Sequence, residues 1–508
     1  MLIKLNLKAA ASFLCFICLF FFSKAIAQSS ATIPGDFPDP SVIYANGEYF
    51  AVGTSSEWSP HLPIYSSKNM HDWVQTGFVF SSTPEWAESS FWAPEYFYHD
   101  GLYYIYYSAK RKGDGISCIG VATSRFPDRD FVDQGIVVDY GSESIDAYVV
   151  KEGDDLYMTW KAYGLDDRPI ELLGSKMSKD GMSLIGEPFT LIKDTQKIGI
   201  EGQSFVKKNG YYYMFYSAGA CCGPACDYRV YASRSKSIKE PFTNVSETVL
   251  LGENNFWKCM GHGTFVLGPR DKYYYLFHGY NKEGTVYTGR EGLLAELIWS
   301  DKGDPVFDFV ENSNQVHKDI ILDFTKSNDQ LWQWDFKNNK PTWKFTPKGV
   351  RIGGEVVPSN ETGIVLTWRP NSKHYAINTK LFLDESNAQA LKGLAIYGEK
   401  NKAIGLGVQL NKVQVWETND QGIQELTTVE LPQGLKAIEL KMIVLADQSC
   451  TVYYKKADNW ISIDLAGKSF SIKDLAPWDR SPRAGLHFKG EKDQYGFFSN
   501  FAMKNLAK

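Results

Sequence analysis

Beyond its first 27 residues, the sequence has no apolar run long enough to cross a membrane as a helix. It also lacks an excess of positive charge, since 54 Lys and Arg stand against 59 Asp and Glu for a net charge of −5. This balance does not provide the basic surface that nucleic-acid binding needs. Sustained 3.6-residue apolar periodicity is missing as well, which excludes long amphipathic helices. We therefore expect no membrane span, no nucleic-acid partner and an all-β fold.

The strongly apolar N-terminal stretch fits a secretory signal peptide. Lys4 and Lys8 form a basic start, and the apolar run from Ala9 to Phe22 follows. This run is shorter than the roughly 20 residues of a spanning helix. Residues 25–27 read Ala-Ile-Ala, a small-residue cleavage site. We expect residues 1–27 to be removed and the mature protein to be secreted or periplasmic.

Cysteine is scarce, and its spacing does not fit a zinc site. The chain has eight cysteines, two of which lie in the predicted leader. The segment ACCGPAC, residues 220–226, lacks paired Cys-x-x-Cys spacing. Export favours disulfide bonds over metal ligation. We expect Cys226 to form a disulfide, with its partner left open.

Aromatic residues are abundant at 15%, and many of them belong to an internal repeat. Five segments share a turn followed by a tyrosine-rich strand: NGEYFAVGTS, DGLYYIYYSA, GDDLYMTWKA, NGYYYMFYSA and RDKYYYLFHG. Their matching tyrosines are Tyr49, Tyr103, Tyr157, Tyr212 and Tyr274, which are 54, 54, 55 and 62 residues apart. Asn-Gly and Asp-Gly between β-rich runs indicate hairpins. A repeat of this length suits one four-stranded blade, so residues 28–318 are predicted to form a five-bladed β-propeller.

The pattern changes after about Ile320. Alternating apolar and polar residues follow in short runs such as GIVLTW, GLAIYG and KVQVWET, with polar turns between them. A period of two is typical of half-buried strands. Residues 319–508 are therefore predicted to form a β-sandwich.

The repeat places five side chains around one axis. Counting back 10 to 12 residues from each repeat tyrosine leads to Asp39, Trp92, Asp146, Glu201 and His262. Each stands at or just before an apolar run that reads as the first strand of its blade. The first strands of a propeller line its central channel. Residues scattered over the chain would then meet at one end of that channel.

Three carboxylates at one channel mouth favour chemistry over a structural role. A single acid at the start of a strand usually caps a turn, but three converging acids repel one another in a poorly solvated cleft. Two carboxylates flanking a bond can hydrolyse a glycoside, and a third can raise the pKa of the acid. Metal binding is the competing use of Asp, Glu and His. The indole in the same ring favours a sugar.

These motifs together resemble glycoside hydrolase family 43, the five-bladed propeller enzymes, over roughly residues 33–318. FPDPSVI is similar to the family's opening motif, which implies that Asp39 is the general base. SIDAYVV resembles the segment whose aspartate tunes and orients the acid, which implies this role for Asp146. IEGQSFVKKNGYYYMFYSAG resembles the general-acid segment, which implies that Glu201 is the acid.

The resemblance extends to binding residues. FWAPEYFYHDGLYYIYYS is similar to the segment that places an aromatic wall at the sugar, here Trp92. TGREGLLAEL resembles the segment whose arginine reaches the sugar in the first subsite, here Arg290. GHGTFV is similar to the segment whose histidine faces an axial ion or water, which implies a calcium site at His262. Departures at Ala147 and Gln203, where members often have Pro, weaken any transfer of substrate specificity.

The C-terminal region, with LDFTKSNDQLWQWDF and GLHFKGE, resembles the concanavalin-like sandwich of family β-xylosidases. The sandwich would complete the active-site mouth, bind polysaccharide, or act only as a buttress. The resemblance implies a secreted inverting glycoside hydrolase that acts on plant cell-wall oligo- or polysaccharide, as β-xylosidase or α-L-arabinofuranosidase. An arabinan- or galactan-cleaving enzyme and a non-catalytic sugar-binding propeller are the alternatives.

Overall fold

The computed structural model describes residues 30–163, 169–245, 248–310, 318–326 and 331–506. These residues form β-strands and two short 3-10 helices, η1 (Pro269–Asp271) and η2 (Thr285–Tyr287), and include no α-helix. The described part of the chain thus contains no helix that could span a membrane. The predicted leader, residues 1–27, lies outside the described residues. The all-β prediction is confirmed.

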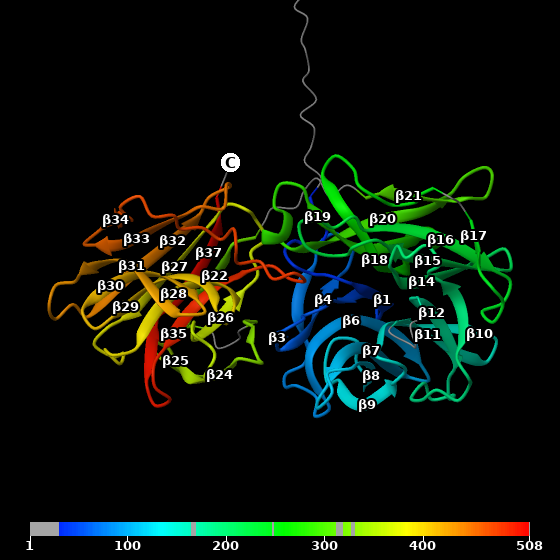
Figure 1. The fold of residues 1–508 in the computed structure, drawn as a ribbon, viewed down its shortest axis with the longest axis horizontal. Coiled ribbons are helices and arrows are strands. Elements are labelled where there is room, and N and C mark those ends of the chain that lie inside the picture. The colour runs from blue at the N-terminus through cyan, green and yellow to red at the C-terminus, as the bar shows by residue number, and fades with distance from the viewer. Residues whose placement is uncertain (1–29, 164–168, 246–247, 311–317, 327–330, 507–508) are drawn as a thin grey trace, which may run out of the picture.

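The first part of the chain is a ring of five four-stranded units (Figure 1). A parallel contact between β8 and β10 joins the second and third units into one sheet. In chain order the units are β1 (Ser41–Ala45), β2 (Glu48–Val52), β4 (His61–Ser67) and β5 (Val74–Phe80); β6 (Ala87–His99), β7 (Leu102–Arg111), β8 (Ser117–Ser124) and β9 (Val132–Val138); β10 (Glu143–Glu152), β11 (Asp155–Tyr163), β12 (Glu171–Lys176) and β13 (Phe189–Lys193); β14 (Ile200–Lys208), β15 (Tyr211–Ala218), β16 (Arg229–Ser235) and β17 (Thr243–Asn244); and β18 (Trp257–Leu267), β19 (Tyr273–Asn281), β20 (Arg290–Trp299) and β21 (Pro305–Phe309). This is the predicted five-bladed propeller.

Local sequence explains the first hairpin of several blades. Asn46 and Gly47 have φ of 53° and 86°, and Asn209 and Gly210 have φ of 50° and 78°. Two consecutive left-handed residues match the right-handed twist of the flanking strands. These turns place every repeat tyrosine on the second strand of its blade, at Tyr49, Tyr103, Tyr157, Tyr212 and Tyr274.

The ring is closed by its N-terminal segment. The backbone N–H groups of Thr32 and Ile33 donate to the carbonyl of Gly292 in β20, at 2.8 and 3.0 Å. The N–H of Phe37 donates to the carbonyl of Arg290 at 2.8 Å. The chain therefore enters its first blade along the last one, which brings Asp39 beside residues of β19 and β20.

The rest of the chain forms two sheets that enclose one apolar core, which is the predicted β-sandwich (Figure 1). One sheet has nine strands, β22 (Ile320–Asp323), β24 (Asn339–Thr346), β25 (Gly349–Val356), β27 (Tyr375–Phe382), β32 (Ala437–Val444), β33 (Cys450–Lys456), β34 (Asn459–Ser462), β36 (Tyr495–Phe498) and β37 (Asn500–Asn505). The other has six, β26 (Ile364–Trp368), β28 (Leu391–Glu399), β29 (Lys402–Gln409), β30 (Lys412–Asn419), β31 (Gly422–Glu430) and β35 (Arg483–Lys489). The predicted boundary at 318–319 adjoins residues 311–317, which lie outside the description, and it stays a prediction.

The sandwich packs against the first blade. Strands β3 (Trp58–Ser59) and β23 (Trp334–Asp335) pair to form a small sheet between the two parts. The buried carboxylate of Asp36 accepts hydrogen bonds from the N–H groups of Arg290 and Ser481, both at 3.1 Å. One side chain thus joins the N-terminal segment, the last blade and the sandwich, and it fixes the sandwich loop beside the channel.

Candidate active site

A left-handed residue in or just before the first strand of each blade shapes the end of the channel. These residues have φ between 42° and 61°: Asp39, Ala93, Asp146, Gly202 and His262. In blades two to five the strand pairing slips at this point, as in a β-bulge. A bulge bends its strand and re-aims the neighbouring side chains. The predicted ring is therefore offset by one residue at Trp92 and Glu201, which precede the left-handed residue.

Hydroxyl groups on or just after the second strands hold three of these bends. Thr54 accepts a hydrogen bond from the N–H of Ala93 at 2.7 Å. Ser108 accepts one from Asp146 at 3.2 Å, and Ser217 accepts one from His262 at 2.8 Å. In each case the hydroxyl belongs to one blade and the N–H to the next, so the ring of blades itself fixes the bends.

Asp39 lies in a dense network of hydrogen bonds. Arg290 Nη1 donates to its Oδ1 at 2.9 Å, and Thr54 Oγ1 donates to its Oδ2 at 2.7 Å. Its backbone N–H donates to Nδ1 of His278 at 3.1 Å. Burial opposes ionisation, but the charge of Arg290 and the histidine contacts hold the pKa of Asp39 well below its usual range. Asp39 is therefore a carboxylate at every ordinary pH.

His262 stands between the carboxylates. Its Nδ1 is 3.5 Å from Oδ1 of Asp39 and 3.9 Å from Oδ2 of Asp146. The imidazole of His262 also leaves no room for a side chain at Gly202, where an added Cβ would lie 2.8 Å from the imidazole. The glycine after Glu201 therefore lets the strand that carries Glu201 pack closely against His262.

Asp146 contacts the backbone next to Glu201. Its Oδ2 accepts a hydrogen bond from the N–H of Gly202 at 3.0 Å, and its carbonyl accepts one from Gln203 Nε2 at 2.6 Å. Burial raises the pKa of Asp146 to about 6, and the nearby charge of Glu201 acts in the same direction. Asp146 is placed to orient the segment that carries Glu201.

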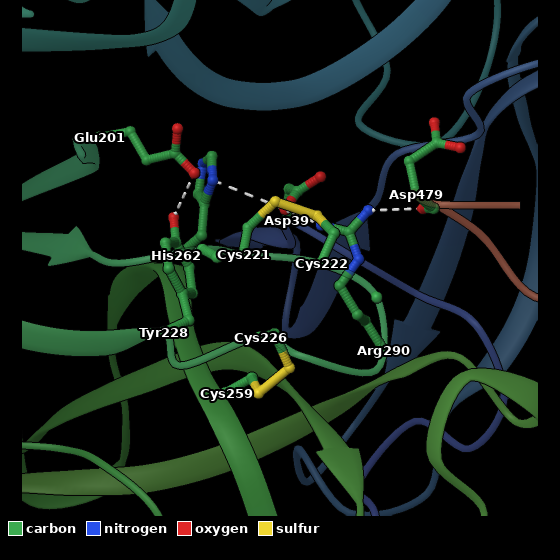
Figure 2. The surroundings of a disulfide bond; sticks show 12 residues. Asp39, Glu201, Cys221, Cys222, Cys226, Tyr228, Cys259, His262, Arg290 and Asp479 are labelled. Atoms are coloured by element: carbon green, nitrogen blue, oxygen red, sulfur yellow. Dashed lines mark hydrogen bonds and ion pairs between the residues drawn. A yellow bond between two sulfur atoms is a disulfide. The ribbon is translucent and has the colours of Figure 1, made fainter. Parts of the chain in front are cut away.

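Glu201 is paired with a lysine that the sequence analysis did not single out. Lys161 Nζ, on β11, donates to Oε2 of Glu201 at 2.6 Å, and the Tyr228 hydroxyl donates to Oε1 at 2.8 Å (Figure 2 shows the tyrosine contact). Burial raises the pKa of Glu201, but Lys161 and His262 outweigh it, so the pKa lies below its ordinary value. We expected Asp146 to raise the pKa of Glu201. In the site without substrate, the pKa of Asp146 is raised and that of Glu201 is lowered, because the positive charge of Lys161 stabilises the carboxylate of Glu201.

Replacing Lys161 by Met should move the alkaline limb of the pH–rate profile upward. Loss of a positive charge that touches Glu201 removes a stabiliser of its carboxylate, so Glu201 holds its proton to higher pH, by about 1–3 pH units. The pH dependence of kcat/KM measures this. Lys161→Arg, which keeps the charge, is the matched control and should leave the limb in place. An unchanged or lowered limb in Lys161→Met would exclude this ion pair as a determinant of the profile.

The predicted binding residues lie where the propeller meets the sandwich. Trp92 and Trp478, the latter from the sandwich and 62% exposed, have ring centroids 6.1 Å apart in an edge-to-face arrangement. Arg290 Nη2 donates to the carbonyl of Asp479 at 2.9 Å (Figure 2). The sandwich thus supplies an exposed indole beside Trp92 and a hydrogen-bond acceptor to Arg290.

The protein groups around His262 do not by themselves make a calcium site. The described residues contain no group of three or more His, Cys, Asp or Glu side chains placed to hold a metal ion. Calcium takes six to eight oxygen ligands. A calcium ion beside His262 would therefore take most of its ligands from water.

Lys161, Tyr228 and His278 are the contacts that sequence reasoning missed. A signal was present for two of them, because Lys161 and His278 both stand four residues after the repeat tyrosine of their blade. In the other blades this repeat position holds Gly53, Tyr107 and Tyr216. A charged or imidazole side chain at a repeat position that holds Gly or Tyr in the other blades is therefore a sequence signal of a contact in the site. The contact of Tyr228 with Glu201 has no comparable signal.

Comparison with known proteins identifies the family. Residues 29–305 match the model of glycosyl hydrolases family 43. The chain belongs to glycosyl hydrolase family 43. This family 43 chain is 26% identical over 324 residues to the extracellular exo-α-(1→5)-L-arabinofuranosidase ArbA of Cellvibrio japonicus, covering 55% of this chain and 89% of that one. It is 22% identical over 508 aligned positions to a β-xylosidase of Bacillus subtilis, covering 88% and 92%.

A solved structure shares the whole fold of this family 43 protein. Xylan β-1,4-xylosidase from Bacillus halodurans superposes with a TM-score of 0.77 at 20% identity, covering 94% of this chain and 100% of that one. At this identity the likeness shows the fold alone. The propeller and the sandwich thus occur together in a solved structure.

Proposed function

We propose that this glycoside hydrolase is an exported, inverting enzyme that removes terminal pentose units, xylose or arabinofuranose, from plant cell-wall polysaccharide. The observation that carries the proposal is the meeting of Asp39, Asp146 and Glu201, from three blades, around His262. A propeller that only binds sugar has no need for an ionised carboxylate, a second carboxyl with a raised pKa and a third held by a lysine. Inverting glycoside hydrolysis requires two carboxyl groups, one that donates a proton to the leaving group and one that takes a proton from water.

The environments of the carboxylates support separate roles. Asp39 is always ionised and can accept a proton from water, as a general base must. Glu201, which Tyr228 and Lys161 orient, is the proposed general acid, and its ion pair with Lys161 must break before it can hold a proton. Asp146 is the proposed positioning residue. Trp92 and Arg290 are proposed to contact the sugar.

The two-part architecture favours action at chain ends. The β-xylosidase relative aligns over both parts, whereas the arabinofuranosidase relative aligns over 55% of the chain. Trp478 lies against Trp92 at one side of the mouth, and a mouth narrowed by a second domain suits a terminal sugar better than a continuous chain.

Hydrolysis of defined substrates tests the proposal. We expect release of single pentoses from xylo-oligosaccharides or arabino-oligosaccharides, and activity on the matching aryl glycosides. Proton NMR of the first-formed sugar should show the anomeric configuration opposite to that of the substrate, because an inverting site holds a water between base and sugar. Retention would contradict the assignment of Asp39 as base, and failure on every glycoside would favour a binding propeller.

Within the proposed function, arabinan is the alternative substrate to xylan. The relative named as an exo-α-(1→5)-L-arabinofuranosidase matches at higher identity, 26%, than the β-xylosidase, 22%. The same substrate panel decides between them. Faster hydrolysis of α-1,5-arabino-oligosaccharides than of xylo-oligosaccharides would establish it.

A calcium ion held mainly by water beside His262 is a separate prediction. Such a site would be labile, so exhaustive chelation should lower both activity and melting temperature, and added calcium should restore them. Magnesium, which binds with stricter octahedral geometry, is the control ion. If chelation changes neither quantity, His262 acts only through its contacts with the carboxylates.

A further inference from the structure

The loop between β15 and β16, residues 219–228, carries two disulfide bonds next to the site. Cys226 is bonded to Cys259 of β18, which confirms the expected disulfide of Cys226. Cys221 is bonded to its neighbour Cys222, with their Cα atoms 3.7 Å apart. The first bond ties the loop to the strand that carries His262. The second bond joins two adjacent residues and ties nothing else.

Both ends of this loop lead to the catalytic groups. Ser217, just before it, is the cross-strand partner of Glu201 and accepts the hydrogen bond from the N–H of His262. Tyr228, its last residue, donates a hydrogen bond from its hydroxyl to Glu201 at 2.8 Å. One end of the loop therefore follows the strand that pairs with Glu201, and the other end contacts the Glu201 carboxylate.

The middle of the loop reaches the other side of the site. The N–H of Gly223 donates to the hydroxyl of Tyr280 at 3.3 Å, and Tyr280 is the cross-strand partner of Arg290. An added Cβ on Gly223 would lie 3.8 Å from the carbonyl of Trp478, so the loop also adjoins the sandwich. In Figure 2 the Cys221–Cys222 bond is drawn across Asp39, between His262 and Arg290.

A bracing role accounts for the Cys226–Cys259 bond but not for the adjacent pair. The stabilisation that a disulfide gives by restricting the unfolded chain grows with the loop it closes, and Cys221–Cys222 closes the shortest loop available. The loop is already held by the hydrogen bond from the Ala220 N–H to Asp227 Oδ1 at 2.8 Å and by the bond to Cys259.

The side chains of Cys221 and Cys222 are only half-buried. Cys221 packs on its inner side against the cluster that includes Tyr228 and Tyr280. The remaining exposed sulfur surface is apolar, polarisable and backed by fixed groups. Sugar sites combine such apolar walls with a few polar groups, and here Asp39 and Arg290 supply the polar groups.

We propose that the Cys221–Cys222 disulfide is a substrate-contacting wall of the active-site mouth, against which the apolar face of a pentose residue packs. This inference rests on the proposed function. The bond keeps two adjacent side chains in one fixed surface and removes two thiols from the neighbourhood of the carboxylates. The occupant is a sugar ring of the oligosaccharide bound at Asp39 and Arg290.

Protection from reduction tests the contact without altering either disulfide. Glu201→Gln protein, which is expected to hydrolyse oligosaccharides about 10²–10⁴-fold more slowly, is treated with a phosphine reductant with and without xylotriose or α-1,5-arabinotriose. Thiols are alkylated and assigned by mass spectrometry. With sugar at about ten times its Kd, reduction of Cys221–Cys222 should slow about tenfold, because only the free fraction reacts. Reduction of Cys226–Cys259 should proceed at its original rate.

A double variant gives an independent readout. In C221S/C222S we expect KM for the trisaccharide to rise about tenfold, with kcat and melting temperature little changed, because a binding contact is lost. Cys118→Ser, a buried free thiol on β8, is the control and should keep the wild-type KM.

The outcomes separate this inference from the proposed function. If the sugar binds but reduction of Cys221–Cys222 is not slowed, or C221S/C222S keeps the wild-type KM, the disulfide is not a substrate wall. If the wild-type protein neither binds nor hydrolyses any pentoside, the proposed function fails and this inference fails with it.

Discussion

Glu201→Gln is expected to slow hydrolysis of natural oligosaccharides by about 10²–10⁴-fold, the usual contribution of general acid catalysis. Their leaving groups are alkoxides, which need a proton as the glycosidic bond breaks. Aryl glycosides with an activated phenol leave without one and should lose far less. Comparing kcat/KM on both substrate kinds measures the difference.

The same substitution leaves the buried Lys161 without its carboxylate, so it should also lower stability, by about 3–5 kcal/mol. The double variant Glu201→Gln/Lys161→Met removes the unpaired charge and should regain melting temperature without regaining activity on oligosaccharides. This control separates lost catalysis from lost fold. Equal losses on both substrate kinds would show that Glu201 is not the acid, and the buried Glu95 would be examined next.

Asp39→Asn should slow oligosaccharides and activated aryl glycosides alike, again by about 10²–10⁴-fold. Every substrate needs the attacking water to lose its proton, whatever its leaving group. An amide keeps the size of the side chain but is no base. Parallel measurement of kcat/KM on the two substrate kinds shows whether the losses are equal.

Asp36→Asn, three residues earlier, is the matched control. Its side chain accepts hydrogen bonds from the backbone of Arg290 and Ser481, so its loss should appear mainly as a lower melting temperature. A loss in Asp39→Asn that is confined to natural oligosaccharides would assign acid catalysis, not base catalysis, to Asp39.

The propeller could be predicted from the sequence because its hairpin turns depend on residues adjacent in the chain. Asn46-Gly47 and Asn209-Gly210 determine hairpins within a few residues, and the repeat spacing then gives the number of blades. The bulges are less visible, because a bulge depends on pairing with a neighbouring strand. This is why Trp92 and Glu201 stand one residue away from the left-handed positions of their blades.

The partners of the carboxylates depend on contacts between blades. The Lys161–Glu201 ion pair joins β11 to β14, and the Arg290–Asp39 pair joins residues 251 positions apart. The pairing of Cys226 with Cys259 also crosses from one blade to the next. The candidate acids could be found one by one, but their pKa shifts could not, because Lys161 reverses the direction expected for Glu201.

The closure of the ring by the N-terminal segment decides when a new chain can become active. Asp39 is made early, but Arg290, which pairs with its carboxylate, is made 251 residues later, and the backbone of Ser481 reaches Asp36 across 445 residues. Such long-range contacts form late in folding, since they must close large loops. A ribosome that stops between Glu201 and Arg290 therefore releases a chain with all three carboxylates and no assembled site.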